Sequence, residues 1–287
     1  MAATNPPEPQ QLVLWEDNLR AMPVAFARGA LFRAAAKGQR RRIDGQIAAA
    51  PGITVRYTGE ELRTDDEDLL MSLLHNLRGK SLRDPEQLKV QKYRHELLRD
   101  LERNVTGDYY RDLERSLDRL AEGTLKVTYR NPTTGKLYKV TQSIIRKVAV
   151  ADKDGPGACY TIWVEPEILQ FFSDSDDYYK ISWQDRVRLG RPLSKWTHAT
   201  LQSLRLPLVG QIGLKVADVL KLSGSEASSL ASFKVILRRC LEEMRTQGVI
   251  GAYSFARNGF FFVSKPGISD INSSAATIFD LSMEKSS

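Results

Sequence analysis

Residues 107–143 read GDYYRDLERSLDRLAEGTLKVTYRNPTTGKLYKVTQS, and this stretch determines the fold that we expect. Its first part places large apolar residues three or four positions apart, the period of a helix with one buried face: Tyr109, Leu113, Leu117 and Leu120. Gly123 is typical of a helix end. The turn-forming residues 131–135 join the two segments that follow. The stretch therefore predicts a helix over residues 107–121 and a β-hairpin with strands 125–130 and 136–143.

The residues before this helix complete a recognisable unit. Ile53, Val55 and Tyr57 alternate with polar residues and predict a half-buried strand. One helix is predicted to start near Thr64, and a second is predicted over residues 85–104. Residues 11–36 have only moderate helical character. Three helices followed by a hairpin describe a winged helix.

The second half of the chain repeats this order. It predicts helices over residues 193–206, 216–222 and 226–247, then strands 249–255 and 260–263 joined at Asn258-Gly259, a strong hairpin signal. The expected fold class is therefore α+β, with two tandem winged-helix domains, each a three-helix unit followed by a β-hairpin wing. The expected domains are an N-terminal arm (1–50), the first winged helix (51–175), the second winged helix (176–266) and a flexible C-terminal tail (267–287).

The charge of the chain favours an acidic partner, either nucleic acid or an anionic membrane. The 287 residues contain 42 Lys and Arg against 35 Asp and Glu, a net charge of +7. Residues 111–147 hold nine basic and four acidic side chains, and residues 181–205 hold five basic and one acidic. Residues 152–177 between them hold seven acids and one lysine. Two basic segments separated by an acidic one predict two binding surfaces.

Several other classes of protein are disfavoured. The chain has no run of about 18 apolar residues that would span a membrane. Its first ten residues do not resemble a secretory signal, and its two cysteines exclude a disulfide framework, so we expect a cytoplasmic protein. No zinc-site spacing or Gly-x-Ser-x-Gly nucleophile elbow is present. We therefore expect no enzymatic activity, no cofactor and no metal.

The third helix of each unit would carry the DNA contacts, because that helix of a winged helix enters the major groove. The first such helix has four candidate DNA-binding residues: Tyr110, Arg111, Arg115 and Arg119. The last three recur every fourth residue, opposite the leucines, and an arginine fork suits guanine or phosphate. Alternatively, these arginines pair within the helix with neighbouring acids.

The corresponding helix of the second unit has short polar side chains near its start, which would let it approach the groove floor. Its candidates are Ser228, Ser232, Lys234, Arg238 and Arg239. In the two hairpins, the candidates for phosphate contact are Lys136, Lys139 and Arg257. The alternative interpretation is an ordinary solvated helix and two solvated turns.

Three stretches give the chain a resemblance to a known family. They are residues 20–32 with RAMP and ARGALF, residues 57–66 (YTGEELRTDD), and residues 107–120, which begin GDYY. From about Leu12 to Pro266, the chain resembles the TrfA-type initiators of plasmid replication. This resemblance implies two winged helices that bind direct repeats (iterons) in double-stranded origin DNA. It also implies opening of adjacent AT-rich duplex, recruitment of the host initiator, replicative helicase and sliding clamp, and a homodimer that dissociates to act.

The segment QLVLW, residues 11–15, is similar to the peptide by which many bacterial proteins bind the sliding clamp. Its candidate clamp-binding residues are Gln11, Leu12, Leu14 and Trp15. A flexible tail would deliver the apolar side chains into a pocket on the clamp. The alternative is that Leu12, Leu14 and Trp15 simply cap the domain.

Three other functions compete with replication initiation. A transcriptional regulator would use the same two winged helices on operator DNA. A nicking enzyme would need a closely spaced histidine pair to hold its metal, and the chain has no such pair. A structural or partner-binding module would bind DNA weakly and without sequence preference.

Overall fold

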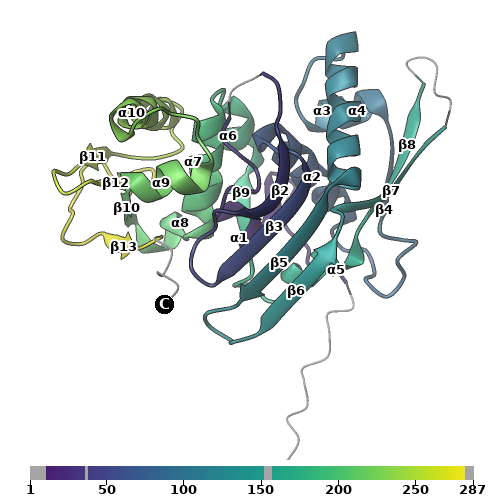
Figure 1. Cartoon of the computed structure of the whole chain (residues 1–287), viewed down its shortest axis with the longest axis horizontal. Coiled ribbons are helices and arrows are strands. Elements are labelled where there is room, and N and C mark those ends of the chain that lie inside the picture. The colour runs from purple at the N-terminus through teal and green to yellow at the C-terminus, as the bar shows by residue number, and fades with distance from the viewer. Residues whose placement is uncertain (1–10, 36–37, 152–156, 282–287) are drawn as a thin grey trace, which may run out of the picture.

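A computed structural model describes residues 11–35, 38–151 and 157–281, and its fold is mixed α+β (Figure 1). The first half contains a four-stranded antiparallel sheet in the order β2–β3–β5–β6. Its strands are β2 (Arg42–Ile47), β3 (Ile53–Glu60), β5 (Thr124–Arg130) and β6 (Leu137–Gln142). Residues alternate between buried and exposed along β3, which confirms the predicted strand.

Three helices and a smaller sheet complete this half. The helices are α2 (Thr64–Leu77), α3 (Arg94–Asp100) and α4 (Gly107–Glu122). The three-stranded sheet has the order β4–β8–β7, with β4 (Lys89–Tyr93), β7 (Ile145–Ala151) and β8 (Cys159–Val164). The predicted helix over residues 107–121 is confirmed. The predicted helix over residues 85–104 is wrong in its first half, because residues 89–93 pair with β8.

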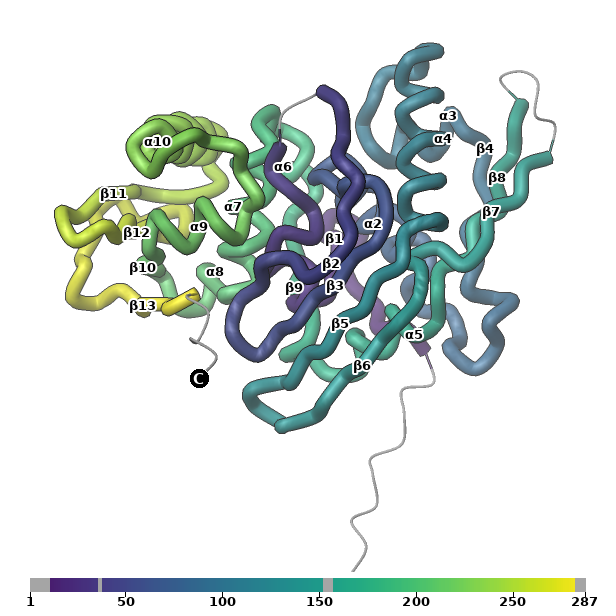
Figure 2. Tube along the Cα trace, viewed as in Figure 1, coloured from purple at the N-terminus to yellow at the C-terminus, as the bar shows by residue number. Residues whose placement is uncertain are grey.

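The position of the hairpins also differs from the prediction. The hairpin β5–β6 forms, but it belongs to the four-stranded sheet. Its turn lies at the lower end of the molecule in Figure 2, whereas α4 begins at the upper end. The hairpin beside α4 is β7–β8, which is not among the predicted elements. Lys136 in the turn before β6 and Lys139 on β6 therefore lie away from the start of α4.

The second half begins with β9 (Tyr178–Ser182) and has its own four-stranded sheet, in the order β11–β12–β10–β13. Its strands are β10 (Gln211–Lys215), β11 (Tyr253–Phe255), β12 (Phe260–Ser264) and β13 (Thr277–Phe279). Its helices are α6 (Trp183–Arg188), α7 (Pro192–Ser203), α8 (Leu206–Val209), α9 (Val216–Ser223) and α10 (Leu230–Thr246). The three predicted helices correspond to α7, α9 and α10. The prediction of a loose tail after residue 266 is wrong for β13, which pairs in parallel with β10.

Residues 19–34 join the two halves instead of forming an arm. The strand β1 (Leu19–Pro23) pairs with β9, and the short helix α1 (Val24–Ala27) follows it. The backbone oxygen of Gly29 accepts a hydrogen bond from the indole of Trp196 at 3.1 Å. A side chain at Gly29 would collide with the carbonyl oxygen of Ala48, 2.7 Å from the Cβ position. Apart from α1, the predicted helical character of this region is wrong, because the pairing of β1 with β9 determines its conformation. Residues 1–10, the expected flexible tail, lie outside the described residues.

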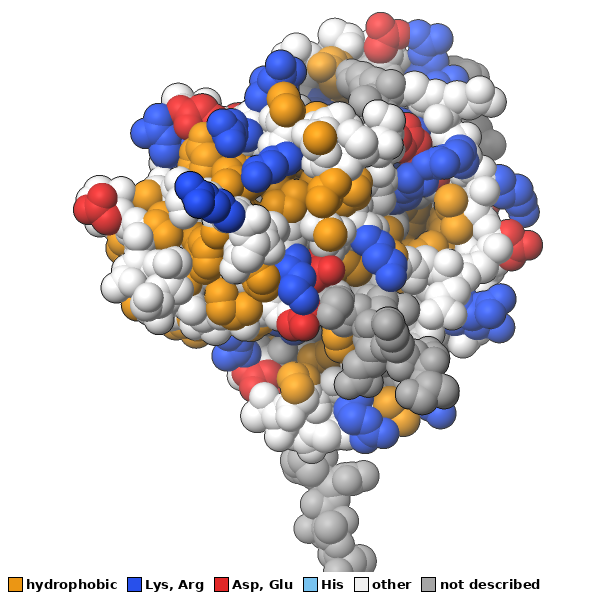
Figure 3. Space-filling view, turned by 60° about the vertical axis from the view of Figure 1, so that its left-hand side comes forward, with side chains coloured by type: hydrophobic (Ala, Val, Ile, Leu, Met, Phe, Trp, Pro, Cys, Tyr) orange, Lys and Arg blue, Asp and Glu red, His pale blue; other side chains and the backbone are white. Residues whose placement is uncertain are grey.

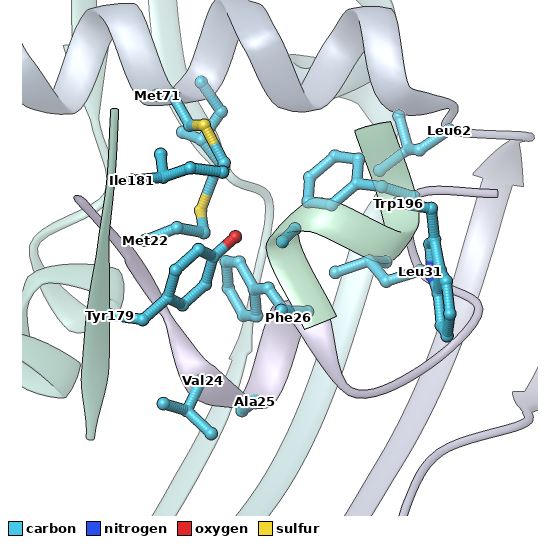
Figure 4. Packing of buried hydrophobic residues seen from close by; sticks show 14 of the residues in the cluster. Met22, Val24, Ala25, Phe26, Leu31, Leu62, Met71, Tyr179, Ile181 and Trp196 are labelled. Atoms are coloured by element: carbon cyan, nitrogen blue, oxygen red, sulfur yellow. The ribbon is translucent and has the colours of Figure 1, made fainter. Parts of the chain in front are cut away.

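Apolar side chains from both halves meet around this segment (Figure 4). Phe26 and Met22 come from the segment itself, Met71 from α2, Tyr179 from β9 and Trp196 from α7, and all five are buried. The remaining short helices, α5 (Pro166–Leu169) and the 3-10 helix η1 (Gln170–Phe172), bring Phe171 against Phe26. The two halves therefore share one continuous core.

A buried ion-pair network also connects the halves. Arg186 on α6 is completely buried and donates to Glu67 and Asp68 of α2, each at 2.7 Å. Burial raises the pKa of Glu67 despite this contact. Burial also opposes the charge of Asp68, but Lys195, Arg186 and Arg103 surround that carboxylate and lower its pKa. The network fixes α2 against α6 and α7.

Replacing Arg186 with Met should destabilise the fold by about 3–5 kcal/mol, because it leaves buried carboxylates without their partner. Arg188→Met on the same helix is the matched control, since Arg188 is exposed and its loss should change stability by less than about 0.5 kcal/mol. Urea denaturation monitored by circular dichroism measures both. Equal stabilities of the two variants would contradict a structural role for Arg186.

Candidate nucleic-acid interface

The helix α10 starts with a cap built from serines. Ser229 is the N-cap residue, and its hydroxyl accepts a hydrogen bond from the backbone N–H of Ser232 at 3.1 Å. The Ser232 hydroxyl accepts in return from the backbone N–H of Ser229, also at 3.1 Å. This reciprocal capping box satisfies backbone groups that a helix start leaves unpaired. Ser232 thus serves the helix itself, whereas Ser228 is exposed ahead of it.

The basic residues of α10 lie on and beside its exposed side. Lys234 and Arg238 both lie over the ring of Phe255 on β11, at 5.2 and 5.3 Å from the ring centre. Arg239 is exposed and turned away from the core. Among the described residues, no carboxylate lies within ion-pair distance of these three cations. Their charge is therefore available to an external anion.

The hairpin β11–β12 lies next to this helix. Its turn contains Arg257, which is exposed, and Gly259, whose φ of +84° belongs to the left-handed region that favours glycine. The predicted Asn-Gly hairpin is confirmed. Figure 3 brings this side of the molecule forward and shows Lys and Arg side chains among exposed hydrophobic ones.

The four candidate residues on α4 differ in their exposure and in their contacts. Arg115 is exposed, and no ion pair is formed by it within the described part of the chain. Arg111 is exposed but paired with Asp108 one turn earlier. Tyr110 is half-buried, with the guanidinium of Arg94 stacked 4.1 Å from its ring centre. Of the three arginines, Arg115 is thus the one that is exposed and forms no ion pair among the described residues.

The expectation that Arg119 lies on the exposed side of α4 is wrong. Its side chain is only 7% exposed and donates to Asp66 Oδ1 at 2.7 and 3.1 Å. Asp66 Oδ2 accepts from Arg40 at 2.7 Å, so this carboxylate holds two arginines inside the protein. The regular spacing of the three arginines predicts that all of them lie on one exposed side, but Arg119 faces α2.

A basic groove of about 670 Å³ separates α4 from the start of α7. Arg115 of α4, Arg103 and Lys195 line it, together with Tyr109. Lys195 pairs with Asp68 at 2.5 Å, and Arg103 is 3.9 Å from the same carboxylate. Neither Arg103 nor Lys195 is among the predicted contact residues, although Lys195 belongs to the basic segment 181–205. The start of α4 and the whole of α10 lie along the same upper side of the molecule in Figure 1.

Residues 11–15 do not form a free peptide. The side chains of Leu12 and Trp15 are only 1% and 6% exposed, whereas Leu14 is 69% exposed and Gln11 lies at the surface. Leu12 exchanges backbone hydrogen bonds with residues 79 and 80. The indole of Trp15 stacks on Phe172 and donates to His75 Nδ1 at 3.1 Å. The expected presentation of both leucines and the tryptophan to a clamp is therefore wrong for Leu12 and Trp15.

His75 is suited to accept this bond. Burial, together with the nearby cations Arg20 and Arg78, lowers its pKa to about 4, so the ring is neutral at pH 7. The described residues contain no group of three or more His, Cys, Asp or Glu placed to hold a metal. None of the helices in the same residues is long and apolar enough to cross a membrane.

Comparison with known proteins gives a consistent result. The family model described as "TrfA protein" matches residues 10–257. A curated relative, the "Plasmid replication initiator protein TrfA" of Escherichia coli, is 26% identical over 240 residues. That match covers 82% of this chain and 59% of the relative, so the chain spans a little over half of the relative's length.

Two solved structures share the fold. Both contain domains 2 and 3 of RctB, and they superimpose with TM-scores of 0.57 and 0.53 at 12% and 11% identity. The first covers 86% of this chain and 99% of its own, and the second 82% and 95%. At this identity, the likeness concerns the arrangement of helices and strands alone.

Replacing Trp15 with Ala should destabilise the protein by about 3–5 kcal/mol, because a large buried ring is lost. Leu14→Ala is the matched control and should change stability by less than about 0.5 kcal/mol, since Leu14 is exposed. Thermal and urea denaturation measure the difference. A Trp15→Ala protein as stable as wild type would restore the interpretation of a free clamp-binding peptide.

Proposed function

This chain belongs to the TrfA family, and we propose that it initiates plasmid replication by binding direct repeats (iterons) in double-stranded origin DNA. The observation that carries this proposal is the exposed side of α10. It presents Arg239 beside Lys234 and Arg238, which lie over Phe255. None of these three cations forms an ion pair with a carboxylate of the described residues. Such a surface suits the phosphates and guanine edges of a major groove.

Each half corresponds to a winged helix in this proposal. In the second, within residues 176–266, α7, α9 and α10 precede the hairpin β11–β12. In the first, within residues 51–175, α2, α3 and α4 lie beside the hairpin β7–β8. The third helix of each unit would enter the major groove. Arg115 and Tyr110 on α4 would contact one segment of a repeat. Arg111 would join them once it is released from Asp108. The helix α10 would contact the next segment.

The groove between α4 and α7 supports binding to one continuous duplex. Arg115 would neutralise a phosphate that passes between the two contacted segments, while Lys195 and Arg103 on the same groove remain bound to Asp68. Because the shared core holds both units on one chain, the second contact forms at high effective concentration once the first exists. Arg257 would add a phosphate contact from the hairpin.

We further propose that the protein acts in the cytoplasm without enzymatic activity and recruits the host initiator, helicase and sliding clamp. Clamp binding through residues 11–15 would require Leu12 and Trp15 to leave the core, so Leu14 and Gln11 would make the first contact. Homodimers would form away from DNA and dissociate at the repeats. The family membership supports these partners; a transcriptional regulator, the competing function, would bind its operator with none of them.

Mutation of the exposed arginines tests DNA binding directly. Arg239→Ala should cost about 1–3 kcal/mol on repeat DNA and relax sequence preference at one position. Arg115→Ala should reduce the slope of log affinity against log salt by about 1, the effect of one phosphate contact. Fluorescence anisotropy over several salt concentrations measures both.

Lys139→Ala is the matched control, because Lys139 is exposed on β6 and distant from the start of α4. It should bind as wild type does. Equal affinity of the wild type for repeats and for a shuffled duplex would overturn the proposal.

Opening of the duplex requires the protein to bind deformed DNA more tightly than straight DNA. Thymines in the AT-rich segment beside the bound repeats should therefore become reactive to permanganate. The same supercoiled plasmid should remain without nicks in the presence of Mg²⁺. If the protein binds the repeats but the thymines stay unreactive, it binds the origin without opening the duplex.

A further inference from the structure

An apolar side chain lies in the middle of the exposed, basic side of α10. Phe233, Leu237, Cys240, Leu241 and Met244 are buried and define the inner side of the helix. At about 100° per residue, Val235 lies opposite this stripe, and its side chain is 53% exposed. Ala231 and Arg239, one turn before and after it, are also exposed. Helix packing does not account for a valine here.

The surroundings of Val235 carry three cations and one other exposed apolar side chain, Ile236, which is 39% exposed. Lys234 and Arg238 lie on one flank over Phe255, and Arg239 follows Val235 by one turn. Glu242, further along the same side, is occupied by Arg245 at 2.6 Å and by the Tyr253 hydroxyl at 3.0 Å. Ala231 is short enough to let the first turn approach a surface closely. The occupant that fits is an anion with an apolar group at its centre.

The major groove of DNA has these properties. Phosphates line its edges, and the C5-methyl group of thymine is the apolar group on its floor. We propose that Val235 contacts a thymine methyl group in the bound repeat and that Arg239 donates to a guanine nearby. This assignment rests on the proposed function and specifies which bases α10 recognises.

The spacing of the two side chains sets a distance between the two bases. Four residues of helix advance about 6 Å, and neighbouring base pairs are about 3.4 Å apart. A helix lying along the groove therefore places the thymine and the guanine about two base pairs apart. The geometry favours a short motif in which both bases occur at this interval.

Deoxyuridine tests the methyl contact, because it differs from thymidine only by that group. Each thymine of a high-affinity repeat duplex is replaced in turn, and binding is measured by fluorescence anisotropy. Wild type should lose about fourfold in affinity at one thymine, the effect of one buried methyl group. Val235→Ala should lose a similar factor on thymine DNA and lose nothing more at that deoxyuridine.

Val209→Ala is the matched control, since Val209 is a partly exposed valine on α8. It should respond to deoxyuridine as wild type does. Circular dichroism melting checks that the Val235→Ala protein is folded, and the deoxyuridine series on wild type needs no variant at all.

Three outcomes would overturn the assignment. Repeat-specific binding that is insensitive to every deoxyuridine would remove the methyl contact while leaving the proposed function in place. The methyl contact would also be removed if Val235→Ala and the deoxyuridine replacement each reduced the binding affinity independently of the other. A change in sedimentation of Val235→Ala without any change in DNA binding would identify a second copy of the chain as the occupant. If wild-type protein bound repeats and shuffled DNA with equal affinity, the proposed function itself would be refuted.

Discussion

The positions of α4 and α10, the two helices that we propose to contact DNA, depend on the buried guanidinium of Arg186. It bridges two adjacent carboxylates of α2, Glu67 and Asp68, and also donates to the backbone oxygen of Lys195 at 2.6 Å. Because α2 packs against α4 and α7 packs against α10, this one side chain connects the supports of both. An ion pair is costly to bury unless every donor finds an acceptor, so its geometry tolerates little displacement. The network therefore sets the relative orientation of α4 and α10.

Local patterns in the sequence predicted the helices well. The leucines of residues 107–121 and the apolar stripe of α10 have the helical period, and the corresponding side chains, apart from Tyr109 and Leu230, are buried in the structure. Residues 89–93 carry a weaker pattern, and their pairing with β8, about 70 residues away, decides their conformation. The same limit explains β1 and β13, whose partner strands are remote in sequence. Register with a distant strand leaves no local signal.

The charges of the site were harder to interpret than its helices. Counting arginines identified the basic segments but not which side chains were already neutralised. Arg119 and Arg186 are bound to acids of α2, whereas Arg115 and Arg239 are free of ion pairs among the described residues. The stretch YTGEELRTDD carries family resemblance, yet its Glu61 and Asp66 bind arginines inside the protein. Family-specific residues can thus serve the architecture and not the ligand.

The short strand β13 has a consequence for how the second half can be isolated. It covers one edge of β10, and β12 covers the other. A fragment that ended at Pro266 would leave a row of backbone N–H and C=O groups on β10 without partners. Exposed strand edges of this kind recruit strands from other molecules. The last fifteen residues of the described chain thus protect this edge of β10, and a fragment without them would precipitate through strand pairing even with α10 intact.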